Sequence, residues 1–194
     1  MFSLAEPTPL VVHRFLEQQA AHETTYTPRG PIDGLPPAGF VVDQVRFCLG
    51  NGRDVYARAE NALIRWRQFD LGWVRLVGVG PRIAVGEVVA VAAHVAGCWS
   101  MNACRIIETI DESTPHRRFG FVYATLPGHV ARGAERFLVE FSPDDESVWF
   151  EICAVSRPNA LAARLARPLF RHWQDRFRSA AAAAMQHAVE APPA

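Results

Sequence analysis

Hydrophobic and polar residues alternate through most of the middle of the chain. The alternation starts at Phe40, is interrupted over 53–69, and continues from Gly72 to Ser156. A period of two is typical of strands that bury one face. We therefore expect seven strands, over 40–49, 73–79, 82–93, 98–110, 118–126, 135–142 and 147–156. Because the connections between the last six strands are too short to hold crossover helices, the sheet they form is expected to be antiparallel.

Three other segments repeat apolar residues at every third or fourth position, which is the period of a helix with one buried face. They are 10–22, 53–69 and a long C-terminal segment from 157 to about 188. Ser156 is the expected N-cap of the last helix, and Pro158 would lie in its first turn. Pro168 would remove one backbone hydrogen bond, so we expect a kink or break near 164–168.

This order of elements predicts an α+β fold of the helix-grip type. A curved antiparallel sheet of about six to seven strands packs on the long C-terminal helix, and a cavity for small ligands lies between them. The alternative is a hot-dog fold, in which the sheet wraps the 53–69 helix, but that fold has no place for so long a terminal helix. We expect one domain over 1–194, composed of an N-terminal helix and loop (1–39), the strands with their helix (40–156) and the C-terminal helix (157–189).

Composition narrows the classes of function. A chain of 194 residues would bury roughly 70% of the surface that its unfolded form exposes, so it needs no disulfide or metal to fold. All 20 basic residues are arginines, and they balance 20 acidic residues. The absence of lysine excludes a Schiff-base lysine, a phosphate-loop lysine and a Ser-Lys dyad. The zero net charge argues against a dedicated nucleic-acid binder.

The cysteines and histidines do not follow the spacing of a metal site. The four cysteines are far apart, at Cys48, Cys98, Cys104 and Cys153. We therefore expect neither a metal nor another cofactor. The longest nearly uncharged stretch, 88–104, is strand-like and contains His94, which argues against a membrane span. With no targeting segment visible at the N-terminus, a cytoplasmic protein is expected.

Three stretches of the chain resemble a known family. They are LGNG at 49–52 leading to RWRQFDLGW at 65–73, FGFVYATLPGH at 119–129, and VWFEICAVSRP at 148–158. In order and spacing these motifs are similar to uncharacterised protein family 0548, over about residues 26–189. That family comprises bacterial and plant proteins of unknown function, so the resemblance implies no activity. It implies the START-like, pollen-allergen-like helix-grip fold. The chain departs from the family pattern at Ala124, where Gly is usual, and at Ala134, where a second acid precedes Glu135.

The most varied side chains lie where the strand over 118–126 ends. Here we single out Tyr123, Thr125 and His129 as candidate ligand-binding residues. His129 could act as a general acid or base near neutral pH, or it could cap the Pro-Gly turn while Tyr123 fills the core. Glu135 could orient His129 across a hairpin, or it could be a solvated hairpin charge.

Further candidates lie along the strand 147–156 and just after it. Alternation places Trp149 and Glu151 on one face, which is either the solvent side or the cavity side. A carboxylate inside the cavity would need a partner or a raised pKa and would mark a functional site. Arg157 could bind an anionic ligand group at a helix N-terminus, or it could form a salt bridge that seats the helix.

Three functions follow from these residues. The first is binding of a small apolar or amphipathic molecule in the helix-grip cavity, where aromatic side chains are plentiful. The second is an enzyme that uses the same cavity for acid-base or hydrolytic chemistry. The third is a protein-interaction module, which would have a filled core and an exposed apolar patch. The residues do not decide the ligand, the oligomeric state or whether a reaction is catalysed.

Overall fold

A computed structural model describes residues 1–28, 30, 32, 34–78, 80, 82–159 and 167–190 of the chain. Its elements follow one another in an order close to the expected one. They are β1 (Phe2–Ser3), α1 (Pro9–Ala20), β2 (Val41–Asn51), α2 (Arg53–Ile64), the 3-10 helix η1 (Arg67–Phe69), β3 (Val74–Val77), β4 (Val88–Val95), β5 (Cys98–Glu112), β6 (Arg117–Thr125), β7 (Ala131–Phe141), β8 (Ser147–Pro158) and α4 (Arg167–Glu190).

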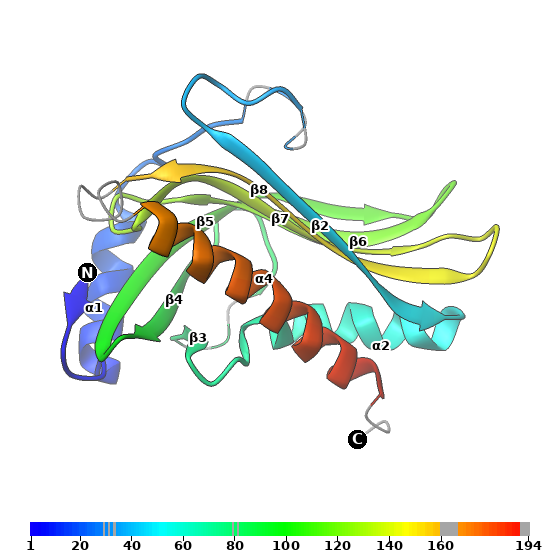
Figure 1. Ribbon diagram of the computed structural model, residues 1–194, viewed down its shortest axis with the longest axis horizontal. Coiled ribbons are helices and arrows are strands. Elements are labelled where there is room, and N and C mark those ends of the chain that lie inside the picture. Colours follow the sequence, from blue (N-terminus) through cyan, green and yellow to red (C-terminus); the bar gives the residue numbers. More distant parts are fainter. Residues whose placement is uncertain are drawn as a thin grey trace.

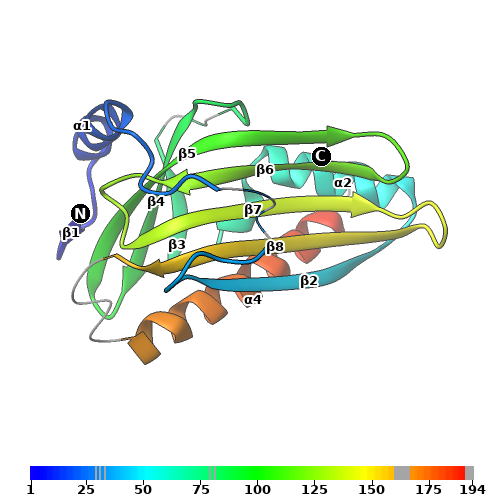
Figure 2. The same ribbon diagram turned by 90° about the horizontal axis from the view of Figure 1, so that it is seen from above.

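The strands form one antiparallel sheet that curves around the C-terminal helix. Their order is β2-β8-β7-β6-β5-β4-β3, and the short strand β1 pairs with β5. The sheet arches over α4, which runs diagonally across its concave face, and α2 lies beside α4 under the same face (Figure 1). Seen from above, the long strands β5 to β8 and β2 lie side by side (Figure 2). The predicted α+β fold, with a curved antiparallel sheet packed on a long C-terminal helix, is therefore confirmed.

Two apolar layers lie on the two faces of the sheet, because inward and outward residues alternate along each strand. The concave face packs on α2 and α4 and carries the main core, including Phe121, Phe137 and Phe150. The convex face carries a smaller cluster that includes Val122 and Val155, and it packs against the segment before β2. The concave side therefore holds most of the aromatic side chains.

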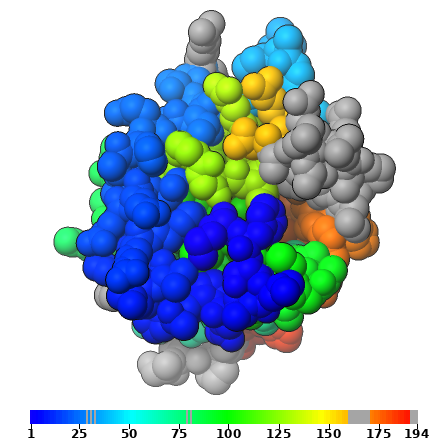
Figure 3. All heavy atoms as spheres, turned by 90° about the vertical axis from the view of Figure 1, so that its left-hand side faces the viewer, coloured from blue at the N-terminus to red at the C-terminus, as the bar shows by residue number. Residues whose placement is uncertain are grey.

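The N-terminal segment closes one end of the molecule. The side chain of Thr8 caps α1 by accepting a hydrogen bond from the amide of Val11, and Pro9 opens the helix. Phe15 packs with residues of β4 and β5 in a separate apolar cluster. In the view of Figure 3 the N-terminal residues, in blue, spread over this end. The sequence did not predict β1, which is only two residues long.

The start of the C-terminal helix was predicted wrongly. Ser156 is not a helix cap, because β8 continues to Pro158 and Ser156 pairs in register with Val41 on one side and Gly133 on the other. Among the described residues α4 spans Arg167–Glu190, and Pro168 is the second of them. Residues 160–166, where part of the expected break falls, lie outside the described residues.

Other boundaries also shift. The predicted helix over 53–69 is divided into α2 and η1, and Trp66 between them has a left-handed backbone with φ 59°. The predicted strand over 82–93 starts only at Val88, whereas β7 starts four residues earlier than expected, at Ala131. None of the helices in the described part of the chain has an apolar stretch long enough to span a membrane.

Candidate functional site

Polar side chains meet in one row across the concave face. Glu135 of β7 pairs in register with Tyr123 of β6 on one side and with Ala154 of β8 on the other, and Asp43 of β2 pairs with Ala154. Residues that lie directly opposite each other in an antiparallel sheet project from the same face. The register therefore places two carboxylates on the inner side of the sheet, with only the methyl group of Ala154 between them.

Glu135 and Tyr123 form a hydrogen-bonded pair inside the fold. The Tyr123 hydroxyl donates to Oε2 of Glu135 over 2.7 Å. Aromatic rings surround the pair, and the centroid of the Phe137 ring lies 5.5 Å from that of Tyr123. Burial raises the pKa of Glu135 from 4.5 to about 7, although the Tyr123 hydrogen bond and the charge of Arg178 both lower it. A carboxyl with this pKa exists in both protonation states near neutral pH.

Helix α4 brings two arginines to the same region. Arg171 donates through both terminal nitrogens to Asp43, and the Nη2 to Oδ1 distance is 2.6 Å. Arg178 is buried, pairs with Asp175 on its own helix and lies 3.9 Å from Asp43. These ion pairs hold α4 against β2, because a two-pronged guanidinium-carboxylate contact fixes both distance and orientation.

Small residues surround Glu135 on the sheet. Besides Ala154, its neighbours on this face are Gly133, two residues earlier in β7, and Ser156, which pairs with Gly133. A Cβ atom at Gly133 would lie 2.0 Å from the carbonyl oxygen of Val155, so only glycine fits there. The side chain of Glu135 keeps part of its surface accessible although it lies on the inner face. Bulky side chains are therefore absent from the sheet on this side of the carboxyl.

Gln174 of α4 lies over the same small residues. Its Nε2 donates to Oγ of Ser156 over 3.3 Å. Its Oε1 atom is buried and has no hydrogen-bond partner in the described part of the chain. A buried acceptor without a partner costs about 1–3 kcal/mol.

His129 lies away from this row and has a structural contact of its own. Its Nδ1 accepts a hydrogen bond from the amide of Ala131 over 2.9 Å, at the start of β7. Burial lowers the pKa of His129 to about 4. The ring is therefore neutral near pH 7 and caps the turn, and Glu135 bonds to Tyr123 instead of to His129.

Thr125 also has a structural contact. Its hydroxyl bonds to the amide and the carbonyl of Gly133, at 3.0 and 3.1 Å, and meets the hydroxyl of Thr25 at 2.5 Å. These bonds tie the segment before β2 to the end of β6. Thr125 therefore joins chain segments next to the Glu135 row.

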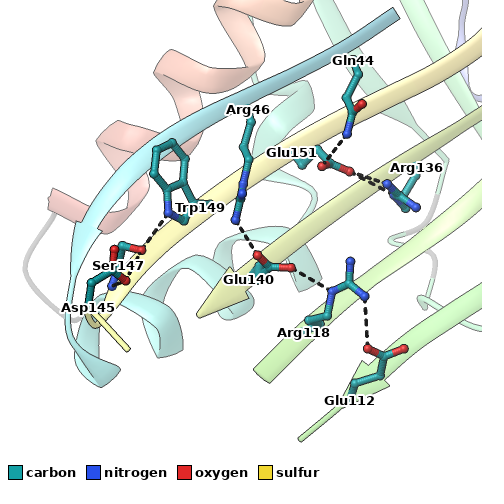
Figure 4. Close-up of polar contacts among 10 residues, drawn as sticks. All are labelled: Gln44, Arg46, Glu112, Arg118, Arg136, Glu140, Asp145, Ser147, Trp149 and Glu151. Atoms are coloured by element: carbon teal, nitrogen blue, oxygen red, sulfur yellow. Dashed lines mark hydrogen bonds and ion pairs between the residues drawn. The ribbon is translucent and has the colours of Figure 1, made fainter. Parts of the chain in front are cut away.

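Trp149 and Glu151 project from the convex face (Figure 4). Glu151 forms an ion pair with Arg136 at 2.6 Å and accepts a hydrogen bond from Gln44 at 2.9 Å. Trp149 donates to Ser147, and the guanidinium of Arg46 lies over its ring. Of the two positions open for Glu151, the structure shows the outer one, away from Glu135.

Arg157 likewise lies outside the concave row, near the end of β8. Its guanidinium lies 4.9 Å from the centre of the Phe40 ring. Because β8 continues past Arg157, the residue does not lie at a helix N-terminus as expected, and an anion-binding role for Arg157 stays a prediction. Of the seven candidates, the structure brings Tyr123 and Glu135 into contact on the concave face and places Thr125 beside them. The other four candidates lie away from this row.

Sequence reasoning missed Asp43, Gln174 and Arg178 as members of the site. Asp43 carried a usable signal, because it alternates with Val41, Val45 and Phe47 on the face that the pattern predicts to be buried. Gln174 and Arg178 lie one turn apart on α4 and could not be told from solvated helix residues without the packing. Among the described residues, no three His, Cys, Asp or Glu side chains are grouped closely enough to hold a metal ion.

Comparison with known proteins identifies the family. Residues 21–184 match the family described as "Domain of unknown function (DUF1990)". The chain is 34% identical to a UPF0548 protein of Dictyostelium discoideum, over 72% of this chain and 68% of the relative. It is 32% identical to a UPF0548 protein of Deinococcus radiodurans, over 87% of this chain and 89% of the relative. The chain belongs to the UPF0548 family. UPF0548 relatives thus occur in an amoeba as well as in bacteria and plants.

Several solved structures share the course of the chain at low sequence identity. One is norcoclaurine synthase from Thalictrum flavum in complex with dopamine and hydroxybenzaldehyde, with a TM-score of 0.49 and 14% identity over 87% of this chain and 97% of that one. Another is Ara h 8.0201, with a TM-score of 0.46 and 13% identity over 78% and 98%. At this distance the likeness concerns the arrangement of sheet and helix and says nothing about the UPF0548 site.

Proposed function

We propose that the chain binds a small, largely apolar molecule with one polar end between the concave face of the sheet and α4. The observation that carries this proposal is the position of Glu135. This carboxyl lies on the inner face among aromatic rings and is partly exposed, and no basic side chain in the described part of the chain is bonded to it. A purely structural core seldom retains such a group, because burying a charge without a charged partner is unfavourable.

The surroundings of Glu135 fit a molecule with two different ends. On one side lie the rings of Phe121, Phe137 and Phe177, which offer apolar contact area. On the other side lie the small residues Gly133 and Ser156, with Gln174 above them. An apolar body would lie against the rings, while the polar end would reach Glu135. Ligand sites in proteins commonly combine an apolar lining with a few placed polar groups.

A second candidate function is acid-base catalysis at the same place. It is favoured by the pKa of Glu135, which burial raises to about 7, and by the Tyr123 hydroxyl that hydrogen-bonds to it. General acids and bases work best when their pKa lies near the operating pH. In this version Glu135 exchanges a proton with the bound molecule and Tyr123 orients the carboxyl. His129 has no role in this reaction, because its Nδ1 atom accepts the hydrogen bond from the amide of Ala131 in the turn.

Native mass spectrometry of the protein purified from its own host tests the proposal. The expected result is a mass above that of the chain, which returns to the chain mass on denaturation, with one small molecule released per chain. Chemical identification of the released molecule then supplies the compound for a catalytic assay. An unmodified mass from cells grown under several conditions would count against tight binding, and titration with apolar probes that produced no heat and no shift in melting temperature would overturn the proposal.

A further inference from the structure

Two side-chain oxygen atoms near the concave face of the sheet have no hydrogen-bond partner in the described part of the chain. Glu135 accepts one hydrogen bond, from Tyr123 to Oε2, and its Oε1 atom accepts none within the described part of the chain. The Oε1 atom of Gln174 is buried and also without a partner. Gln174 bonds to Ser156, Ser156 pairs with Gly133, and Gly133 is two residues from Glu135 in β7. Two residues along a strand span about 7 Å, so Gln174 and Glu135 are associated with neighbouring positions along β7.

The cationic groups nearby already have carboxylate partners. Arg171 is bonded to Asp43 through both terminal nitrogens, and Arg178 is paired with Asp175 and lies near Asp43. Glu135 thus lacks the directly bonded cation that Asp43 possesses. Among the described residues, the unpartnered groups of Glu135 and Gln174 are acceptors, which a donor on a bound molecule would satisfy.

Two further unpartnered polar groups belong to a different contact. The indole nitrogen of Trp173 and the amide of Gln68 are also buried without a hydrogen bond. The Trp173 ring packs on Trp73, and η1, which contains Gln68, meets α4 where Phe69 stacks on Phe177. Trp173 and Gln68 therefore lie toward β3 and η1, whereas Gln174 faces β8.

We propose that the bound molecule carries a protonated amine, which donates to Glu135 and Gln174, on an apolar body that lies against the aromatic rings. This inference rests on the proposed function. An ammonium group has three donors and no acceptor, which matches two unsatisfied acceptors. Its charge complements the ionised form of Glu135, and the faces of aromatic rings attract cations. A carboxylate or phosphate end would instead meet the carboxyl of Glu135, which has its own sign when ionised.

Three probes with nearly the same apolar body test which charge the site prefers at the polar end of its ligand. They are 2-phenylethylamine, 2-phenylethanol and 3-phenylpropanoate, which present a cationic, a neutral and an anionic end. Isothermal titration of the full chain at pH 8 is expected to give a dissociation constant for the amine about tenfold or more below that for the alcohol, with the acid weakest. Equal affinity for amine and alcohol would overturn the inference.

Isosteric substitutions test whether Glu135 causes the preference for the amine. In Glu135→Gln the amine is expected to lose about tenfold in affinity while the alcohol changes by less than about twofold, so that the preference disappears. Glu151→Gln is the matched control, because it changes the same side chain on the convex face of the neighbouring strand, and it should leave all three affinities unaltered. A preference for the amine that survives Glu135→Gln would assign the selectivity to another part of the molecule and overturn the inference.

Two further results separate this inference from the proposed function. If Glu135→Gln does not fold, titration of the wild-type chain with the amine and the alcohol at pH 8 and pH 5.5 tests the inference instead. Protonation of Glu135 at the lower pH should abolish the preference for the amine. The groups around Glu135 that could titrate or carry charge are Tyr123, Cys104, Asp43 and Arg178. If the molecule released from the native protein contains no amine, the inference fails and small-molecule binding stands. If no molecule is released and no probe binds, both fail.

Discussion

The hydroxyl of Tyr123 and the carboxylate of Glu135 are 2.7 Å apart on neighbouring strands, in direct register and on the inner face of the sheet. This one relationship determines much of the chemistry of the site. The tyrosine stabilises the charged form of the carboxyl, while burial stabilises the neutral form, and the two effects leave the pKa of Glu135 at about 7. Each can be changed separately by substitution.

Tyr123→Phe removes the hydrogen bond and keeps the ring. The pKa of Glu135 is expected to rise above 7, because the remaining effect of burial favours the protonated acid. At pH 8 the free energy of unfolding should fall by about 1 to 2 kcal/mol, since the buried carboxylate loses its donor. Carbon-13 NMR titration of the glutamate side chains measures the pKa directly. Tyr26→Phe, a change on the convex side where Tyr26 packs on Phe40, is the control and should leave Glu135 unaffected.

Ionisation of Glu135 makes the fold less stable as the pH rises. The pKa is higher in the folded chain than its ordinary value of 4.5, so the folded state binds more protons between pH 4.5 and about 7. The contribution of Glu135 is fully present below pH 4.5 and is lost as the pH passes through about 7, at a cost of about 3 kcal/mol. Urea unfolding should show that the wild-type chain loses stability between pH 5 and pH 8, and that this loss is smaller by about 2.5 kcal/mol in Glu135→Gln. The same drop in both proteins would contradict the assignment.

His129 acts in the opposite direction. Burial lowers its pKa from 6.5 to about 4, so the unfolded chain binds more protons between these values. Its contribution is present above pH 6.5 and is lost as the pH falls toward 4, by about 3 kcal/mol. In His129→Asn the amide oxygen can still accept from Ala131, and we expect stability to vary less with pH over this range. Comparison of unfolding at pH 7 and pH 4.5 measures the difference, and an unchanged pH dependence would be the contrary result.

Gly133 allows β7 and β8 to approach each other beside Glu135. A Cβ atom there would overlap the carbonyl oxygen of Val155 at 2.0 Å, so Gly133→Ala forces the two strands apart. We expect a loss of about 3 kcal/mol in the free energy of unfolding. Gly80→Ala is the control, because a Cβ at Gly80 meets nothing within 4 Å, and it should change stability by less than about 0.5 kcal/mol. Thermal unfolding of both variants checks the prediction.

The alternation of apolar and polar residues predicted the strands and their faces well, because a strand that buries one face has an apolar residue at every second position. In β8, Phe150 and Ile152 lie in the main core and Val155 lies in the convex cluster, as the period of two requires. The prediction that the last helix starts at Ser156 was wrong because Ser-Arg-Pro is also typical of the beginning of a helix. Ser156 stays in the sheet because it pairs with residues that are distant in the sequence.

The site itself could be predicted only in part. Tyr123 and Glu135 were both candidates, but their contact depends on the register between β6 and β7, which no local pattern reveals. Neither alternative considered for Glu135, orienting His129 or lying solvated on a hairpin, is what the structure shows, because Glu135 bonds to Tyr123 and His129 accepts from the amide of Ala131. Ala134, where the family resemblance places a second acid, lies in the convex cluster, so it does not share the inner face with Glu135.

Occupancy of the space beside Ala154 tests the central claim most directly. Ala154 separates Asp43 from Glu135, so Ala154→Leu would fill the region with apolar side chain, while Ala183→Leu makes the same change at an exposed position of α4. Both variants and the wild-type chain are purified from the host in parallel, checked by thermal unfolding and measured by native mass spectrometry. We predict a bound small molecule in the wild-type chain and in Ala183→Leu, and its loss from a folded Ala154→Leu. Full occupancy in Ala154→Leu, or none in any of the three, would contradict a ligand site at Glu135.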